Sequence, residues 1–161
     1  MSAYRVEVAR IVPVPASVAF AWVADPRTHP RFIPLTHLRP EPTAPLGVGD
    51  EFTMVSGPGV GRGRPGFPDR MVITAEEPPS SRAGTVGRSA VQKKGPYLYG
   101  DAGFDVVPVD ADRTRIVWWE EARLAGPWPR RANEMLVGLF LRGMMHVSLY
   151  RLARELSRHG R

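Results

Sequence analysis

The sequence contains no cysteine among its 161 residues. Disulfide bonds, thiol nucleophiles and thiolate metal sites are therefore excluded, and the absence is typical of a reducing compartment. Long apolar runs are also missing, because glycine, arginine and histidine interrupt even the most apolar stretch, residues 135–150. A membrane-spanning helix needs about 18 or more apolar residues, and residues 1–10 lack the apolar core of a signal peptide. We therefore expect a cytoplasmic protein with no stable membrane insertion.

Lysine is scarce, with two lysines against 20 arginines. Together with abundant alanine, glycine, proline and valine, this bias is typical of a GC-rich bacterial genome. The net charge of +6 would suit a polyanionic partner, but the basic residues are spread along the chain and form no stripe interleaved with aromatic residues. We interpret the pairs Arg62/Arg64 and Arg130/Arg131 as solvated charges, and we expect no nucleic-acid partner.

Motifs for metal or cofactor binding are missing as well. The four histidines include no H-x-x-x-H pair, which is a common spacing of metal ligands on a helix. The run 61–66 satisfies G-x-G-x-x-G, but Pro65 and Pro68 lead into a strand, whereas a dinucleotide site needs a helix there. We therefore expect neither a metal ion nor a cofactor, and we interpret segment 57–68 as a surface linker or a lid over a cavity mouth. No Ser-His-Asp order, phosphate loop or paired-carboxylate motif supports a hydrolase or a kinase.

The length and the hydrophobic fraction of 43% fit one domain, residues 1–161, with one sizeable core. Alternating apolar residues predict a strand over 4–12. Dense apolar residues then predict a short helix over 16–24, and Asp25-Pro26 begins a second short helix that extends to about Phe32. Strand-like segments separated by Gly, Pro or Asp follow at 36–40, 50–56, 70–77, 85–93, 98–109 and 114–123. The turn 110–112 predicts a hairpin.

Residues 130–157 lack proline and strand alternation, which predicts one helix about 40 Å long. One of its faces carries Ala132, Leu136, Leu139, Gly143, Val147 and Tyr150. Near the end of the helix, the apolar sector shifts to Leu149, Leu152, Ala153 and Leu156. We expect this face to rest on the sheet.

This order of elements resembles the START-like polyketide cyclase superfamily, also called SRPBCC or Bet v 1-like. Four segments spread over the chain carry the resemblance: 14–26 (VPASVAFAWVADP), 47–52 (GVGDEF), 76–79 (EEPP) and 112–118 (DRTRIVW). The resemblance implies an α+β helix-grip fold, in which a curved antiparallel sheet of about seven strands wraps around a long C-terminal helix and two short helices follow the first strand. The superfamily includes aromatic polyketide cyclases, lipid and sterol carriers and quinone-associated proteins. It therefore implies a hydrophobic ligand and leaves the reaction open.

A bent sheet around a helix leaves room for a cavity between them. The candidate lining residues are Trp22, Phe52, Met54, Met71, Phe104 and Trp118, with Leu136, Leu139 and Gly143 from the helix. Each of them is equally compatible with an ordinary core position. Arg31 and Arg70 are candidate entrance residues that would meet a carboxylate or phenolate, or they form surface ion pairs.

Glu120, His146 and Tyr150 are the candidate catalytic residues. If Thr114 faces inward, strand alternation brings Trp118 and Glu120 inward too, and a carboxyl beside an indole would serve as an acid, a base or a polar anchor. The alternative is a strand end in solvent, which the rarity of buried unpaired Glu favours. His146 would supply a proton shuttle, or it is a structural helix residue.

Three functions remain open. The first is non-covalent binding of a lipid, an aromatic polyketide or a quinone in an internal cavity. The second is a cofactor-free cyclase, aromatase or dehydratase that uses Glu120, His146 and Tyr150. The third is a protein-interaction module with a vestigial cavity, in which Trp128 and the arginine-rich start of the last helix form the contact surface. A cavity with two convergent polar groups would favour the enzyme, whereas a uniformly apolar tunnel would favour the carrier. A filled interior would favour the interaction module.

Overall fold

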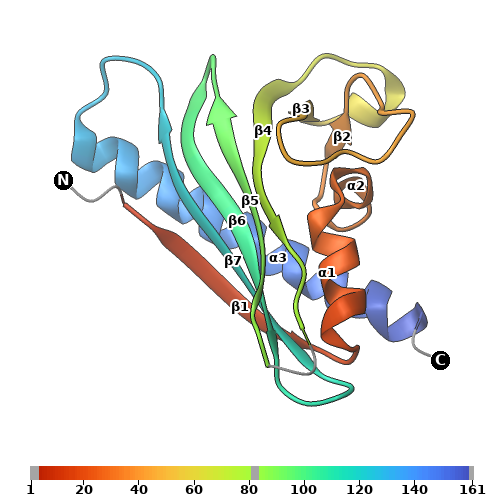
Figure 1. Ribbon diagram of the computed structural model, residues 1–161. Helices are drawn as coiled ribbons and strands as arrows, with labels where there is room; N and C mark the ends of the chain where they lie inside the picture. The colour runs from red at the N-terminus through yellow and green to blue at the C-terminus, as the bar shows by residue number, and fades with distance from the viewer. Residues whose placement is uncertain (1–3, 81–83, 160–161) are drawn as a thin grey trace.

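The computed structural model describes residues 4–80 and 84–159 of the chain. In order, its elements are β1 (Val6–Val12), α1 (Ala16–Ala24), η1 (Pro26–Thr28), α2 (His29–Phe32), β2 (Thr36–Leu38), β3 (Glu51–Ser56), η2 (Val60–Arg62), β4 (Phe67–Glu77), β5 (Gly87–Lys94), β6 (Leu98–Pro108), β7 (Thr114–Leu124) and α3 (Arg130–His159). This order confirms the predicted α+β class, with short helices after the first strand and a long C-terminal helix (Figure 1).

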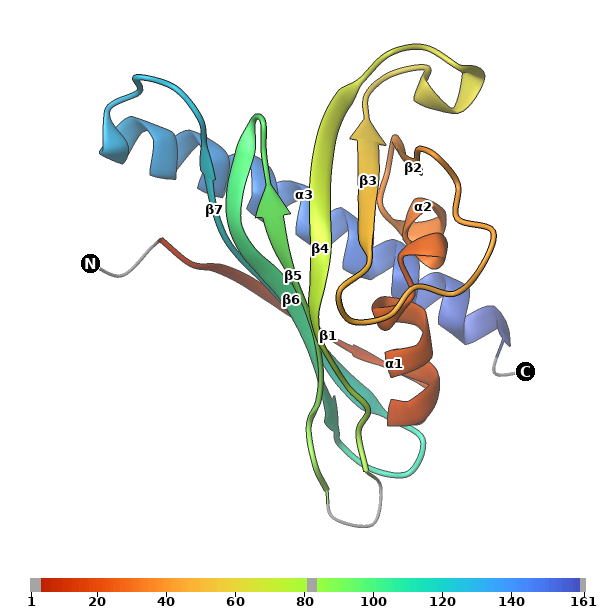
Figure 2. The ribbon, with the colours of Figure 1, turned by 45° about the horizontal axis from the view of Figure 1, so that its top comes forward.

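The strands form one antiparallel seven-stranded sheet in the order β1-β7-β6-β5-β4-β3-β2. From β2 to β7 each strand pairs with the next one in the chain, while β1 pairs with β7 through Val6↔Glu120 to Val12↔Thr114. The sheet curves, and α3 crosses its concave side, while α1 and α2 lie near the middle and C-terminal parts of α3 (Figures 1 and 2). This is the helix-grip arrangement that the resemblance implies.

The predicted boundaries lie close to the observed ones. The hairpin between β6 and β7 forms around Asp110, whose carboxylate accepts hydrogen bonds from the Asp112 amide and the Arg113 side chain. The largest difference is at β4, which begins at Phe67 because Phe67 and Pro68 lie opposite Ser56 and Val55 of β3. The turn residues before β4 therefore end earlier than the sequence indicates.

The orientation of α3 corrects the prediction for most of its length. Leu136, Leu139, Val147 and Tyr150 are 56%, 74%, 50% and 49% exposed, so the predicted contact face points away from the sheet. The buried face consists of Val137, Gly138, Leu141, Met145, Ser148, Leu149, Leu152 and Leu156. The helix is apolar on two opposite sides. The buried series recurs every three or four residues from Val137 to Leu156, so this side offers the longer continuous contact surface. Leu149, Leu152 and Leu156 were predicted correctly.

Membrane-spanning helices do not occur in the described part of the chain, where no helix is both long enough and apolar enough.

Candidate functional site

An apolar wall lines the concave face of the sheet. Phe52 and Met54 on β3, Met71 on β4, Phe104 on β6 and Trp118 on β7 are all at least 93% buried and belong to one hydrophobic cluster. The rings of Phe104 and Trp118 are 5.0 Å apart. The sequence placed these five residues together, and the structure does bring them into one interior surface. That they contact a ligand stays a prediction.

Three charged side chains interrupt this wall. The Lys93 ammonium on β5 lies 2.5 Å from Oδ2 of Asp69 on β4 and 3.6 Å from Oε2 of Glu120 on β7. Side-chain exposure is 5% for Lys93, 15% for Asp69 and 4% for Glu120. We call these residues the interior triad. Because charged residues are rarely buried without a partner or a role, the interior triad is the candidate functional site.

The β6 strand explains how the triad assembles across the sheet. Lys93 pairs with Gly100 and Glu120 pairs with Ala102, so the two β6 residues between them are the small ones. Strands lie about 4.8 Å apart, and β5 and β7 are two strand spacings apart. The long side chains of Lys93 and Glu120 therefore meet over β6 because nothing bulky rises between them.

The position of Glu120 corrects the interpretation that sequence composition favoured. Glu120 is 3% exposed and shares the inner face with Thr114, Ile116 and Trp118, so it is not a strand end in solvent. The alternation argument for Trp118 and Glu120 is confirmed. Its neighbour Glu121 faces outward and forms an ion pair with Arg5 at 3.3 Å.

Burial and charge set the protonation of the triad. Burial raises the pKa of the Glu120 carboxyl above its ordinary value, although the Lys93 charge opposes this effect. Burial alone would lower the pKa of Lys93, but the charges of Glu120 and Asp69 outweigh it, and the pKa lies above its usual value. Lys93 is thus held as an ammonium, while the Glu120 carboxyl gains a proton more readily than an exposed glutamate does.

Two carboxylate oxygens of the triad lack a hydrogen-bond partner. Oδ1 of Asp69 and Oε2 of Glu120 are buried and accept no hydrogen bond, since the 3.6 Å between Glu120 and Lys93 is an ion-pair distance. A buried acceptor without a donor costs about 1–3 kcal/mol. The two oxygens therefore keep unused hydrogen-bond acceptor capacity in the interior.

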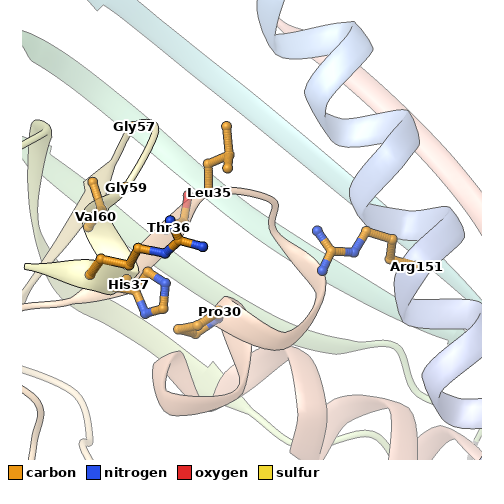
Figure 3. Close-up of a pocket in the computed structure, with 10 residues that line it drawn as sticks. Pro30, Leu35, Thr36, His37, Gly57, Gly59, Val60 and Arg151 are labelled. Carbon is orange, nitrogen blue, oxygen red and sulfur yellow. The ribbon is translucent and has the colours of Figure 1, made fainter. Parts of the chain in front are cut away.

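A pocket of about 400 Å³ lies between the α2–β2 segment, the loop that carries η2, and α3 (Figure 3). Its lining residues are Pro30, Leu35, Thr36, His37, Gly57, Gly59, Val60, Gly61, Arg62 and Arg151. Arg151 extends from α3 towards the side on which Leu35, Thr36 and His37 lie (Figure 3). Segment 57–68, interpreted from sequence as a linker or a lid, thus forms one wall of this pocket, and its Val60 side chain is buried.

The remaining predicted catalytic residues lie elsewhere. His146 and Tyr150 are exposed on the outer face of α3, and the Tyr150 ring is covered by the guanidinium groups of Arg10 and Arg154. The prediction that they join Glu120 is wrong, because the helix presents its opposite side to the sheet. The structure therefore leaves Glu120 as the interior member of that set.

Four other residues that were predicted to line the cavity do not lie on the inner face. Leu136, Leu139 and Gly143 point away from the sheet, for the same reason. Trp22 is half-buried at the molecular surface, where the Arg31 guanidinium stacks 4.5 Å from its ring and the His159 ring meets it edge-on.

The two predicted entrance arginines have different surroundings. Arg31 is half exposed and forms an ion pair with Glu155 at 3.3 Å, as in the surface alternative for this residue. Arg70 is exposed and lines a second pocket of about 440 Å³ beside β3, together with Thr53 and the 40–46 segment.

Sequence reasoning missed Lys93 and the role of Asp69. Both signals were present, because strand alternation places Lys93 on the same face as Ser89, and Asp69 on the same face as Met71 and Ile73. Lys93 is also one of only two lysines in the chain. What the sequence did not indicate is the pairing of β4, β5 and β7, which brings the three charges together.

The part of the chain that the structure describes holds no group of three or more His, Asp or Glu side chains arranged for a metal ion. The interior triad contains two carboxylates, and its third member is an ammonium that repels cations. The charged groups of the interior triad can donate and accept hydrogen bonds.

Comparison with solved structures supports the fold. The Zhui aromatase/cyclase from Streptomyces sp. R1128 superposes with a TM-score of 0.63 at 17% identity, covering 98% of this chain and 95% of that chain. A protein from Thermus thermophilus gives a TM-score of 0.68 at 16% identity, covering 98% and 99%. A protein from Mycobacterium smegmatis gives 0.66 at 13% identity, covering 98% and 93%. At these identities the likeness shows the fold alone.

Comparison of the sequence itself gives two results. No curated protein matches the chain. A family model described as "Polyketide cyclase / dehydrase and lipid transport" matches residues 3–157. With the match extending over nearly the whole sequence, the chain belongs to the polyketide cyclase/dehydrase and lipid transport family.

Proposed function

We propose that the protein binds a hydrophobic small molecule that carries a hydroxyl group, and that it holds this hydroxyl against the interior triad. The observation that carries the proposal is a pair of buried oxygens that accept no hydrogen bond, Asp69 Oδ1 and Glu120 Oε2, beside a cluster of apolar side chains. The family includes cyclases and lipid carriers by its description, which supports a hydrophobic ligand. The triad adds a requirement for a hydrogen-bond donor on that ligand.

The chemistry of the wall favours flat, partly aromatic ligands. Met54, Met71, Phe104 and Trp118 supply polarizable thioether and aromatic surfaces, which adapt to planar rings. Such a ligand would rest on these side chains and direct its phenolic or enolic hydroxyl to the triad. Aromatic polyketides and hydroquinones combine these two properties, whereas a pure hydrocarbon lacks the donor.

A second candidate function is a cofactor-free dehydratase or cyclase, and the raised pKa of Glu120 favours it. A protonated Glu120 would give its proton to a leaving hydroxyl. The Asp69 carboxylate would take a proton from the neighbouring carbon, so that a carbon–carbon double bond forms and water leaves. Lys93 would stabilise negative charge that develops on a nearby carbonyl oxygen. The proton then returns from Asp69 to Glu120 by exchange.

A substitution with a matched control tests the binding proposal. Glu120→Gln keeps the shape of the side chain and changes its hydrogen bonding, while Glu121→Gln makes the same change on the outer face one residue later. The probes are 2-naphthol and 2-methylnaphthalene, which differ in the hydroxyl group, and quenching of tryptophan fluorescence reports their binding. We expect Glu120→Gln to weaken naphthol binding about tenfold and to leave methylnaphthalene unchanged, with Glu121→Gln behaving as the wild type.

Equal loss of both probes in Glu120→Gln, or no loss of either, would show that the triad does not recognise a hydroxyl. Native mass spectrometry of the protein from its own host provides an independent test. A retained adduct without a hydroxyl group would contradict the proposed ligand class. For the enzymatic candidate, turnover of a hydroxylated polyketide intermediate must fall in both Glu120→Gln and Asp69→Asn, because each carries one of the two proton transfers.

A further inference from the structure

The outer face of α3 is strongly apolar at its start. Met135, Leu136, Leu139 and Phe140 are 66%, 56%, 74% and 71% exposed. Trp128, in the segment just before the helix, is 61% exposed. We call these five residues the outer patch. Single exposed apolar residues are common, but large side chains that gather on one turn after another mark an interaction site.

The fold does not need the outer patch. The opposite side of the helix packs on the sheet through Val137, Leu141 and Met145, which are at most 7% exposed. Further along the outer side, a Cβ added at Gly143 would meet nothing within 4 Å. The outer patch therefore does not contribute to the packed interior, and its apolar side chains remain available to a partner.

The charges around the outer patch are almost all of one sign. Arg131 and Arg142 are exposed on the same helix, and Glu134 is the only acidic residue between 122 and 154. Glu134 is already held by Arg130 at 2.7 Å. An apolar surface with cations at its margins has the chemistry of a helix that lies in the interface of an anionic bilayer. Tryptophan is enriched at such interfaces, and arginine can bury its apolar stem there while its charge stays at the headgroups.

A second copy of the chain fits this surface less well. Two such helices packed face to face would bring the exposed Arg131 and Arg142 of both copies into one interface. No acidic residue between 135 and 154 is present to compensate for this repulsion. Charge complementarity therefore favours an anionic partner over self-association.

We propose that the outer patch docks the protein peripherally on an anionic lipid bilayer, with α3 parallel to the membrane plane and Trp128 at the headgroup level. Docking leaves the sheet and the inner side of α3 unchanged, because it uses only side chains that already face away from them. The inference does not depend on what the interior binds.

Vesicle flotation tests the proposal. The wild type should float with phosphatidylglycerol vesicles and bind vesicles of phosphatidylcholine alone more weakly. Leu139→Ser combined with Phe140→Ser should reduce the partition coefficient about tenfold or more, because each change removes buried apolar area. Val48→Ser is the matched control, since Val48 is 61% exposed on the β2–β3 loop, which lies on the other side of the molecule from the start of α3 (Figure 2). It should bind like the wild type.

Two further measurements identify the contact. Arg131→Gln with Arg142→Gln should lower binding to phosphatidylglycerol and make it less sensitive to salt. Brominated lipids should quench the fluorescence of the wild type but not that of Trp128→Phe, because Trp118 and Trp119 are buried and Trp22 lies far along the fold near the C-terminal end of α3.

Three results would overturn the proposal: no flotation with phosphatidylglycerol, flotation that the Leu139/Phe140 variant retains, or a dimer in lipid-free solution that the same variant dissociates. The last result would assign the outer patch to a second copy of the chain.

Discussion

Among substitutions of charged residues, we expect those at Lys93 to lower the free energy of unfolding most. Its ammonium is the one cation of the interior triad, and it neutralises charge on Asp69 at 2.5 Å and on Glu120 at 3.6 Å. Lys93→Met keeps most of the apolar stem and deletes only the charge. Two carboxyl groups then remain in the interior with no cation between them.

Removing one partner of a buried ion pair costs about 3–5 kcal/mol. Glu120 reduces the cost because burial already raises its pKa, so it takes up a proton when its cation is lost. We therefore expect the lower end of the range, about 3 kcal/mol. With a slope of roughly 2 kcal/mol per molar urea, the unfolding midpoint should fall by about 1.5 M.

The assay is urea unfolding followed by tryptophan fluorescence, with Lys94→Met as the matched control. Lys94 is the next residue on β5 but is exposed, so its loss should change the unfolding free energy by less than about 0.5 kcal/mol. Combining Lys93→Met with Asp69→Asn and Glu120→Gln should recover most of the lost stability, because no unpaired charge is left in the interior.

The stability difference between Lys93→Met and the wild type should depend on pH in a definite direction. A carboxyl group whose pKa is raised in the folded state contributes stability below its ordinary pKa and loses that contribution as the pH rises through the folded value. Loss of Lys93 raises the pKa of Glu120 further, so the gap between Lys93→Met and the wild type should shrink on acidification. A loss below 1 kcal/mol at neutral pH, or a gap that widens as the pH falls, would refute the placement of these charges in a buried cluster.

Three further predictions concern single positions. Gly100→Ala should cost about 2 kcal/mol or more, because Gly100 has a φ of 132° and a Cβ there would lie 1.9 Å from the Glu121 carbonyl oxygen; thermal unfolding that is unchanged contradicts this. Gly143→Ala should instead raise the unfolding free energy by about 0.5–1 kcal/mol, since Gly143 is a mid-helix glycine with open space around it; a lower melting temperature would be inconsistent with that space. Burial lowers the pKa of His29, whose ring is hydrogen-bonded to the Val23 carbonyl at 2.9 Å. The stability that the neutral ring contributes above pH 6.5 should therefore be lost as the pH falls through the lower pKa of the folded state. His29→Gln should flatten this acidic part of a plot of unfolding free energy, measured in urea, against pH.

The sequence predicted the elements well because each one carries a local signal. Pro13 and Pro15 end β1, Asp25-Pro26 separates α1 from α2, and the Asp110 turn closes the last hairpin. These residues act through their own backbone, so no knowledge of distant contacts is required. The face of α3 lacked such a local signal, because the helix is apolar on two opposite sides and only the sheet decides which side it buries.

The candidate site was harder to predict for the same reason. Glu120 was found through alternation along one strand, which is a local property of β7. Lys93 and Asp69 belong to two other strands, and their meeting depends on register across four strands and on the small residues Gly100 and Ala102 of β6. His146 and Tyr150 were assigned to the interior only because the helix face was assigned wrongly.

The place of β1 in the sheet also determines when the fold can be completed. Among the described strands, β1 pairs with β7 alone. Thr114 at the start of β7 donates a hydrogen bond to the Val14 carbonyl, 100 residues earlier in the chain. Contacts at such separations slow folding, because the entropy of closing a long loop is lost before the contacts can stabilise the structure. During synthesis, the first strand therefore stays without its partner until β7 has left the ribosome, and α3, which packs against β1, follows after that. The hairpins from β3 to β7 join neighbouring segments and do not depend on β1, so we expect β1 to be among the last strands to join the sheet.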